Sequence, residues 1–332
     1  MTASVFLKKW APAVIGLAVL VAGSALTGDA RLTAISGLLY ASLGLAWNVM
    51  GGFGGLFSFG HAAYFGIGAY TVAVLQVDYE MVPWVAIPVA MAIAGALAAL
   101  TTFSALRYRI NGIFFALGTF AIAEMLRLLV TGSETLKRAG GYRAPLRPEE
   151  SWTWMQWNPE SSNYYLMILG IFATTLVTAV AVGSSRLGYI LVASRDDEDA
   201  AQASGLNPLS PRLVASAISA GLTALCGNFY FEYFLAINPD LAFGQAVSVL
   251  ILLPAIIGGV GTVLGPIVGG FLLAVLNQVM VILVSSPPSW FTLVEGRNGV
   301  DQIIYGATLI LVILLMRHGV WGTVRRRIHA RT

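Results

Sequence analysis

The polar block of residues 184–212 carries the clearest local pattern in this chain. It reads SSRLGYILVASRDDEDAAQASGLNPLSPR and interrupts a sequence that is otherwise mostly apolar. Ser194 is placed to cap the N-terminus of a helix, and Asp197, three residues later, closes a capping box. Gly205 suits the left-handed position that follows a helix, and Pro208 prevents the helix from resuming. The pattern predicts a helix over roughly 195–204, too short to be stable alone in water.

The pattern of this short helix indicates that it docks to another protein. Its exposed side is predicted to carry only small residues, so that another backbone can approach closely; these are Ala200, Ala201, Ala203 and Ser204. A helix that cannot stabilise itself, held between two apolar runs, suits a docking element. The alternative is an ordinary loop helix that packs on its own protein.

Two glycine-rich stretches form the second pattern. Residues 51–70 read GGFGGLFSFGHAAYFGIGAY, and residues 258–270 read GGVGTVLGPIVGG. Glycine this dense lets helices approach closely, or lets the backbone leave the helix where it lines a cavity. Gly261, Gly265 and Gly269 repeat every four residues and predict one smooth ridge. The candidates for helix packing or for the translocation path are Gly52, Gly55, Ser58, His61, Gly66, Gly68, Gly259, Gly261, Gly265 and Gly269.

Ionisable residues inside the apolar runs are few. His61 is interpreted either as a group that senses pH or contacts substrate, or as a hydrogen-bonded structural residue. Glu124 and Arg127 lie three residues apart and are predicted to form a structural ion pair. The sequence holds no GxxxxGK[ST] phosphate loop, no GxSxG motif and no metal-ligand spacing. We therefore expect no catalytic residue, no metal and no cofactor.

Composition predicts that these residues belong to a membrane protein. Of 332 residues, 57% are hydrophobic and 11% are charged, against roughly 25% charged in a soluble domain. The mean hydropathy is +0.78. The net charge of +3 is too small to suggest nucleic acid as a partner, and the single cysteine, Cys226, excludes an internal disulfide.

Ten apolar runs predict an all-α polytopic protein with a single transmembrane domain over residues 1–332. They cover residues 11–27, 33–50, 58–76, 83–105, 112–131, 163–183, 212–236, 244–258, 262–284 and 301–316. The eighth and the last are short enough to be tilted, broken or partly re-entrant. The first is interpreted as a retained span rather than a signal peptide, because TGDARL is a poor cleavage site.

Positive charges predict which side each connection faces. With ten spans, both termini lie on one side. The connections on that side hold twelve lysines and arginines, against six on the other side. The richer side is predicted to be cytoplasmic, which places both termini and residues 186–212 inside. Residues 132–162 then face the periplasm, and Trp152, Trp154 and Trp157 are predicted to anchor them at the membrane interface.

Four blocks resemble one known family. In chain order they are GGFGGLFSFGHAAYFGIGAYTVAVL (51–75), SRDDEDAAQASGLNPLSPRLVASAISAGLTALCG (194–227), INPDLAFGQAVSVLILLPAIIGGVGTVLGPIVGG (237–270) and GVDQIIYGATLILVILL (299–315). The chain resembles the inner-membrane permease subunits of bacterial ABC importers for branched-chain amino acids, on the LivM branch. Together the blocks cover most of the chain between residues 40 and 320.

The resemblance implies the partners of an import complex in the lipid bilayer of the inner membrane. These are a homologous second permease, two cytoplasmic ATP-binding subunits that hydrolyse the ATP, and a periplasmic substrate-binding protein. The resemblance also implies that residues 194–207 contact an ATP-binding subunit. The candidate coupling residues are Ser194, Arg195, Asp197, Ala200, Ala203 and Gly205.

Two stretches depart from the family pattern. The TGGS-like turn common in the family is replaced by the more basic TGSETLKRAGGYRAP at residues 131–145, and a usual Pro-x-Gly-x-x-Gly motif by RHGVWG at 317–322. Branched-chain or other hydrophobic amino acids are the predicted cargo, and urea or short amides are the first alternative. An autonomous secondary transporter or channel is the competing class, but such proteins more often carry intramembrane charges away from helix ends. A membrane-embedded enzyme lacks a catalytic constellation here.

Overall fold

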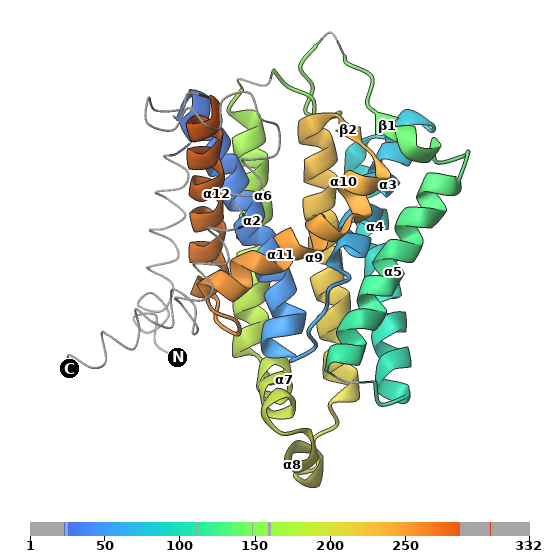
Figure 1. Cartoon of the computed structure of the whole chain (residues 1–332), viewed down its shortest axis with the longest axis vertical. Helices are drawn as coiled ribbons and strands as arrows, with labels where there is room; N and C mark the ends of the chain where they lie inside the picture. The colour runs from blue at the N-terminus through green and yellow to red at the C-terminus, as the bar shows by residue number, and fades with distance from the viewer. Residues whose placement is uncertain are drawn as a thin grey trace, which may run out of the picture.

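The computed structural model describes residues 23, 26–110, 112–147, 149–158, 161–285 and 306. The predicted first and last spans, and the departing motif at 317–322, lie wholly or almost wholly outside these residues. Within the described ranges the chain forms a bundle of long helices with two very short strands (Figure 1).

Each of the eight predicted runs between residues 33 and 284 contains a helix. The long helices are α2 (Gly28–Asn48), α3 (His61–Val77), α4 (Pro83–Arg107), α5 (Ile113–Gly132), α6 (Asn163–Ser184), α9 (Leu209–Phe234), α11 (Gln245–Gly258) and α12 (Leu264–Ser285). In the described part of the chain, seven helical segments are long and apolar enough to cross a membrane. The all-α polytopic class is therefore confirmed, whereas the count of ten depends on residues outside the description.

Short elements connect the long helices. They are η2 (Val49–Phe53, a π-helical turn that continues α2), η3 (Arg138–Gly140), β1 (Tyr142–Arg143), α7 (Arg186–Asp196), α8 (Glu198–Ala203), β2 (Ala236–Ile237) and α10 (Pro239–Phe243). β1 and β2 pair antiparallel, with Tyr142 opposite Ile237.

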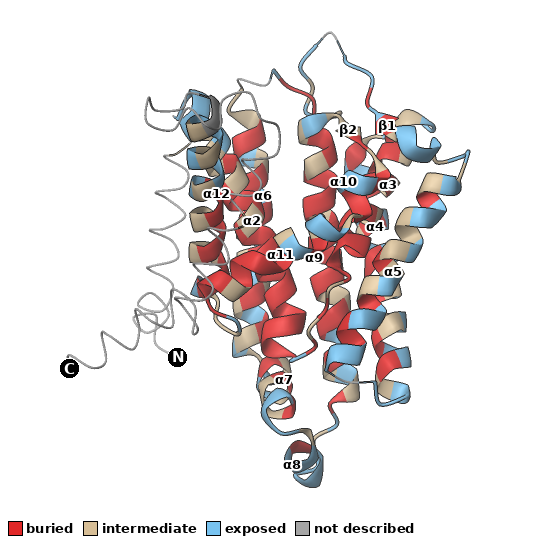
Figure 2. Cartoon of the chain, in the orientation of Figure 1, coloured by how far each residue is buried: buried red, intermediate tan, exposed pale blue. Residues whose placement is uncertain are grey.

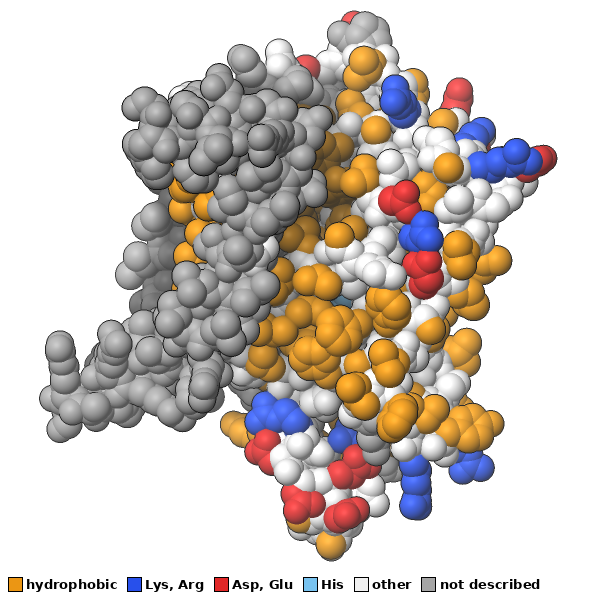
Figure 3. Space-filling model, in the orientation of Figure 1, with side chains coloured by type: hydrophobic (Ala, Val, Ile, Leu, Met, Phe, Trp, Pro, Cys, Tyr) orange, Lys and Arg blue, Asp and Glu red, His pale blue; other side chains and the backbone are white. Residues whose placement is uncertain are grey.

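The centre of the bundle is made by α2 and α9, with α3 beside them (Figure 2). The apolar windows of α2 with η2 and of α9 are 72% and 67% buried, whereas those of α4 and α5 are 28% buried. The exposed side chains of α4 are largely apolar and include Val89, Ile93 and Leu100. Figure 3 shows hydrophobic side chains across the middle of one face, with charged side chains toward both ends. This distribution suits a surface surrounded by lipid.

Two segments depart from straight spans. Residues 54–60 are not helical, and in Figure 1 they rise beside the lower half of the bundle, so that α3 begins near its middle. Helix α11 holds Pro254 and runs strongly inclined to its neighbours in Figure 1. Of the three alternatives left open for the eighth run (tilted, broken or partly re-entrant), an inclined helix matches the first.

Several of the described connections fall at one or the other end of the bundle (Figure 1). The α4–α5 connection lies at the end that carries α7 and α8, called the α8 end (Figure 1). The β1–β2 ladder and the segment between α5 and α6 lie at the opposite, ladder end (Figure 1). The assignment of the α8 end to the cytoplasm stays a prediction from charge.

Side-chain contacts fold the ladder end onto the helices. The Tyr142 hydroxyl donates to Asp78 Oδ2 at 2.7 Å, and Lys137 Nζ lies 3.2 Å from Asp78 Oδ1. The Tyr142 hydroxyl and the Lys137 ammonium lower the pKa of Asp78. Trp157 is buried, its ring centroid 5.1 Å from that of Tyr164. The Trp157 ring therefore faces the protein interior and not lipid, as an anchoring side chain would, whereas Trp152 is exposed.

Candidate functional site

The N-terminus of the short helix predicted over roughly 195–204 differs from the prediction. Helix α7 begins after Ser185, whose side chain caps it by accepting from the Gly188 N–H at 3.3 Å. It continues through Ser194, whose hydroxyl donates to the Ile190 carbonyl instead of capping a helix. The break falls at Asp197, which has extended backbone and accepts from the Ala200 N–H at 2.9 Å. Asp197 is thus the cap of a separate helix, α8, shorter than the predicted 195–204.

The C-terminus of α8 follows the sequence expectation. Gly205 has φ +81°, a left-handed conformation that favours glycine. The Leu206 N–H donates to the Ala201 carbonyl at 3.0 Å, and the Gly205 N–H donates to the Gln202 carbonyl at 2.9 Å. These two bonds form a Schellman motif, which satisfies the last carbonyls of the helix.

Helix α8 is held to the bundle by one buried arginine. Arg212, in the first turns of α9, donates from Nη1 to Glu198 Oε2 at 2.7 Å and from Nη2 to the Ser194 carbonyl at 3.1 Å. Ala201 is buried, which corrects the prediction that it belongs to the exposed side. Ala200 and Ala203 are exposed, and α8 projects beyond the rest of the bundle (Figure 2).

His61 lies at the start of α3, fully buried between two serines. Its Nδ1 is 3.2 Å from Ser58 Oγ, and its Nε2 is 2.9 Å from Ser219 Oγ. Because the Ser219 hydroxyl donates to the Ala46 carbonyl at 2.7 Å, it accepts from His61 Nε2–H. Ser58 then donates to Nδ1, so a neutral ring joins α2, α3 and α9. These contacts favour the structural interpretation of His61.

Several of the candidate glycines bring helices together. A Cβ added at Gly68 would lie 2.1 Å from the Ala224 carbonyl oxygen of α9, and one at Gly66 would lie 2.3 Å from the Phe243 ring. A Cβ at Gly269 would lie 2.0 Å from the Pro254 carbonyl oxygen, and one at Gly265 would lie 2.3 Å from the Gly259 carbonyl oxygen. These close contacts favour the helix-packing interpretation of the four positions.

The predicted ridge of three glycines is wrong at its first member. Gly265 and Gly269 lie in α12, but Gly261 lies in the turn before it, with φ +78°. Gly261 instead lies beside Gly52, and with Gly55 these glycines surround Arg195 of α7. The structure thus brings one predicted coupling residue together with three residues from the two glycine stretches.

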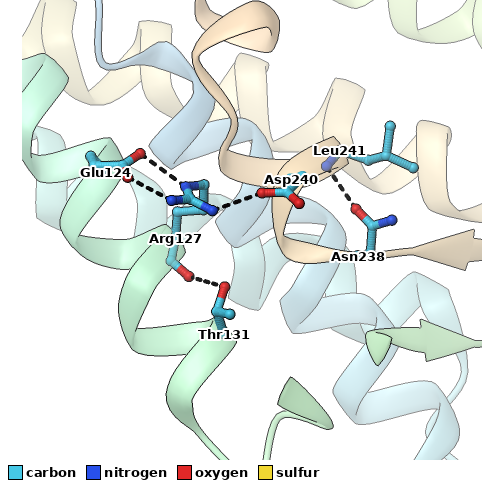
Figure 4. A network of polar contacts seen from close by, with 6 residues as sticks. All are labelled: Glu124, Arg127, Thr131, Asn238, Asp240 and Leu241. Carbon is cyan, nitrogen blue, oxygen red and sulfur yellow. Dashed lines mark hydrogen bonds and ion pairs between the residues drawn. The ribbon is translucent and has the colours of Figure 1, made fainter. Parts of the chain in front are cut away.

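The ion pair predicted within α5 has a further member. Arg127 donates to both carboxylate oxygens of Glu124, at 2.9 and 2.7 Å, and from Nη1 to Asp240 Oδ1 at 2.7 Å (Figure 4). Asp240 belongs to α10, which Asn238 caps by accepting from the Leu241 N–H. This network attaches α10 to α5, and sequence spacing could not reveal the contact between residues 113 positions apart.

Sequence reasoning missed two hollows. The apolar hollow, of about 580 Å³, lies between α2, α9 and α11, and is lined by Tyr40, Leu43, Phe65, Tyr230, Leu250 and Leu253 among others. The polar hollow, of about 480 Å³, lies beside α8 and is lined by Arg107, Arg109, Gln202 and Asn207 among others. Apart from the general glycine pattern, the only sequence signal for the apolar hollow is the aromatic clustering near the end of α9.

Comparison with known proteins identifies relatives over most of this bundle. A family model described as branched-chain amino acid transport system / permease component matches residues 31–323. The high-affinity branched-chain amino acid transport system permease protein LivM of Escherichia coli is 27% identical, over 87% of this chain and 69% of that protein. The autoinducer 2 import system permease protein LsrC of Yersinia pseudotuberculosis is 26% identical, over 67% of this chain and 60% of that protein.

A third relative is the permease protein LivH of Salmonella typhimurium, 25% identical over 46% of this chain and 44% of that protein. No solved structure gives a significant match. The family model covers both glycine stretches, the α7–α8 segment and all the described long helices except the start of α2. The chain therefore belongs to the family of permease components of branched-chain amino acid transport systems, and is an integral protein of the inner membrane.

Proposed function

We propose that this chain is one half of the transmembrane pathway of an ATP-driven importer for branched-chain or other hydrophobic amino acids. A homologous second permease forms the other half, two cytoplasmic ATP-binding subunits supply the energy, and a periplasmic binding protein delivers the substrate. The single observation that carries this proposal is α8, a capped helix that projects from the bundle with Ala200 and Ala203 exposed.

The anchoring of α8 supports a docking role over the alternative of an ordinary loop helix. A loop helix packed on its own protein covers its small residues, but here only Ala201 is buried. The Arg212–Glu198 pair holds the helix in one orientation while its outer face stays free. The polar hollow beside it offers Arg107 and Arg109 to an acidic partner surface.

The apolar hollow supports the choice of cargo. Its lining exposes far more carbon than nitrogen or oxygen, and its aromatic and aliphatic side chains can contact an apolar amino-acid side chain. Urea and short amides need hydrogen-bonding partners instead. The hydrophobic class therefore fits the hollow better than these alternatives.

The test combines docking with transport. Replacing Ala200 or Ala203 with Arg puts a long charged side chain into the proposed contact and should weaken docking by about 2 kcal/mol or more. We expect the ATP-binding subunits to be lost on purification, and uptake of labelled leucine into vesicles to fall with them. Ala139→Arg, the same change at an exposed site of the ladder end, should leave co-purification unchanged.

Two outcomes would contradict the proposal. Normal co-purification and uptake in both α8 variants would show that α8 is an ordinary loop helix and not a docking element. Uptake by the purified chain alone in liposomes, driven by an ion gradient, would favour the secondary-transporter class. Competition of leucine uptake by isoleucine and valine is expected, and competition by urea instead would move the chain to the short-amide class.

A further inference from the structure

Three segments that are far apart in sequence meet around one arginine. Arg195, in the last turn of α7, donates from Nη1 to the Gly52 carbonyl at 2.8 Å. A Cβ added at Gly55 would lie 2.6 Å from Arg195 Cγ, and one at Gly261 would lie 2.9 Å from Nη1. The arginine therefore occupies a slot that these glycines leave open, between the α2–α3 connection and the α11–α12 connection.

Asn48 ties these two connections to each other inside the same slot. Its side chain is fully buried, and it donates from Nδ2 to the Thr262 carbonyl at 3.0 Å. Its Oδ1 accepts from the Gly261 N–H at 2.8 Å. Both ends of the amide are thus used across one interface, and Asn48 immediately precedes the π-helical turn that presents the Gly52 carbonyl. Such turns depart from the regular helical hydrogen-bond pattern and are frequent at functional sites.

A second contact fixes the orientation of the arginine. Asp196 Oδ1 accepts from Arg195 Nε at 3.0 Å and from Nη2 at 2.8 Å, which leaves Nη1 directed at Gly52. The planar guanidinium makes both contacts with a single geometry. A lysine ammonium has no such fork, so it cannot reproduce them together.

The two connections held by Arg195 lead to the apolar hollow. Helix α2 contributes Tyr40 and Leu43 to its lining, and α11 contributes Leu250 and Leu253. Asp197, which begins α8, follows Arg195 by two residues. The path from the exposed face of α8 to the hollow is therefore continuous: α8, Arg195, the slot, then α2 and α11.

We propose that Arg195 is the positioning residue that transmits movement of α8 to the α2–α3 and α11–α12 connections, and so to the walls of the apolar hollow. This inference rests on the proposed docking of an ATP-binding subunit to α8. A clamp that only stabilises the fold would lower stability and assembly. A transmitting contact, when cut, instead separates ATP hydrolysis from uptake.

The test uses the full complex in proteoliposomes, with uptake of labelled leucine and ATP hydrolysis measured on the same vesicles. Arg195→Gln keeps a polar side chain but loses the charge and the fork. We expect normal co-purification of the ATP-binding subunits, ATP hydrolysis close to wild type, and about tenfold less leucine taken up per ATP. Arg195→Lys should be intermediate. Arg186→Gln is the matched control, because Arg186 is exposed in the first turn of the same helix.

Each contrary result has a distinct meaning. Wild-type uptake per ATP in Arg195→Gln would refute the transmitting role and leave docking on α8 untouched. Loss of the ATP-binding subunits from Arg195→Gln would also refute it, because the arginine would then only support docking. Failure of the docking proposal itself is seen separately, as normal co-purification in Ala200→Arg and Ala203→Arg.

A second variant tests the same contact from its other side. Asn48→Ala removes the link between the two connections while leaving α7 unchanged. If both residues act through one contact, the double variant with Arg195→Gln should lose little more uptake per ATP than either single variant. Multiplying losses would mean that the two residues act independently, which the proposal does not allow.

Discussion

Gly68 of α3 allows α3 and α9 to pack closely, because it has no side chain. The α3–α9 contact is so close that an added Cβ would lie 2.1 Å from the Ala224 carbonyl oxygen, and one at Gly227 would lie 2.1 Å from the Phe65 carbonyl oxygen. These glycines let two backbones approach where larger residues would separate them. The neutral ring of His61 adds a hydrogen-bonded joint to the same pair of helices.

Gly68→Ala should therefore destabilise the bundle. Overpacking a well-packed contact costs about 1–3 kcal/mol, and here backbone rather than a flexible side chain must move. We expect a lower melting temperature of the purified protein in detergent. Gly118→Ala is the matched control, because its Cβ would enter open space and alanine favours the helix by up to about 1 kcal/mol. Equal melting temperatures for the two variants would show that α3 and α9 are not held this close.

Helix α8 shows how far capping rules reach at the scale of an element. The sequence signal for Gly205 was sufficient, because the left-handed turn depends on local backbone alone. The N-terminal signal was ambiguous, since Ser185, Ser194 and Asp197 are all able to cap a helix. In the structure Ser185 caps α7 and Asp197 caps α8, because α7 continues through Ser194 as far as Asp196. The position and length of the apolar runs, by contrast, predicted all eight described long helices.

A substitution series at Gly205 tests the element. The cost of a left-handed residue is about 1–2 kcal/mol for most side chains and smaller for asparagine. No atom lies within 4 Å of an added Cβ, so backbone strain is the only penalty. Co-purification of the ATP-binding subunits should fall in the order Gly, Asn, Ala, Val. Gly140→Ala, also in open space, should have no effect. Equal recovery across the series would mean that the turn after α8 does not govern docking.

The whole molecule depends on contacts that no sequence window contains. Arg195 and Gly52 are 143 residues apart, and Asn48 and Thr262 are 214 apart. The sequence singled out both glycine stretches and the polar block, but only the fold brings them to one slot. The apolar hollow was missed for the same reason, because its lining combines residues of α2, α3, α9, α10 and α11, from residue 35 to residue 253.

Orientation is the prediction that belongs to this scale. Single cysteines at Asp199 and Thr153, both exposed and at opposite ends, can be labelled in a Cys226→Ser background. An impermeant thiol reagent applied to intact spheroplasts should modify residue 153 and reach residue 199 only after the membrane is opened. The charge asymmetry of twelve to six motivates this result. Labelling of residue 199 from outside would show that the orientation is the reverse of the predicted one, with α8 outside the cytoplasm.

Helix α9 is long enough to connect α8 with the apolar hollow. Arg212 grips α8 at one end, and Tyr230 lines the apolar hollow 18 residues later, about 27 Å along a helix that rises ~1.5 Å per residue. A tilt of about 5° around either end moves the other by about 2 Å, comparable with helix shifts in known conformational switches. Because of the length of α9, a small rotation of α8 at one end is enough to change the width of the hollow at the other end by about 2 Å.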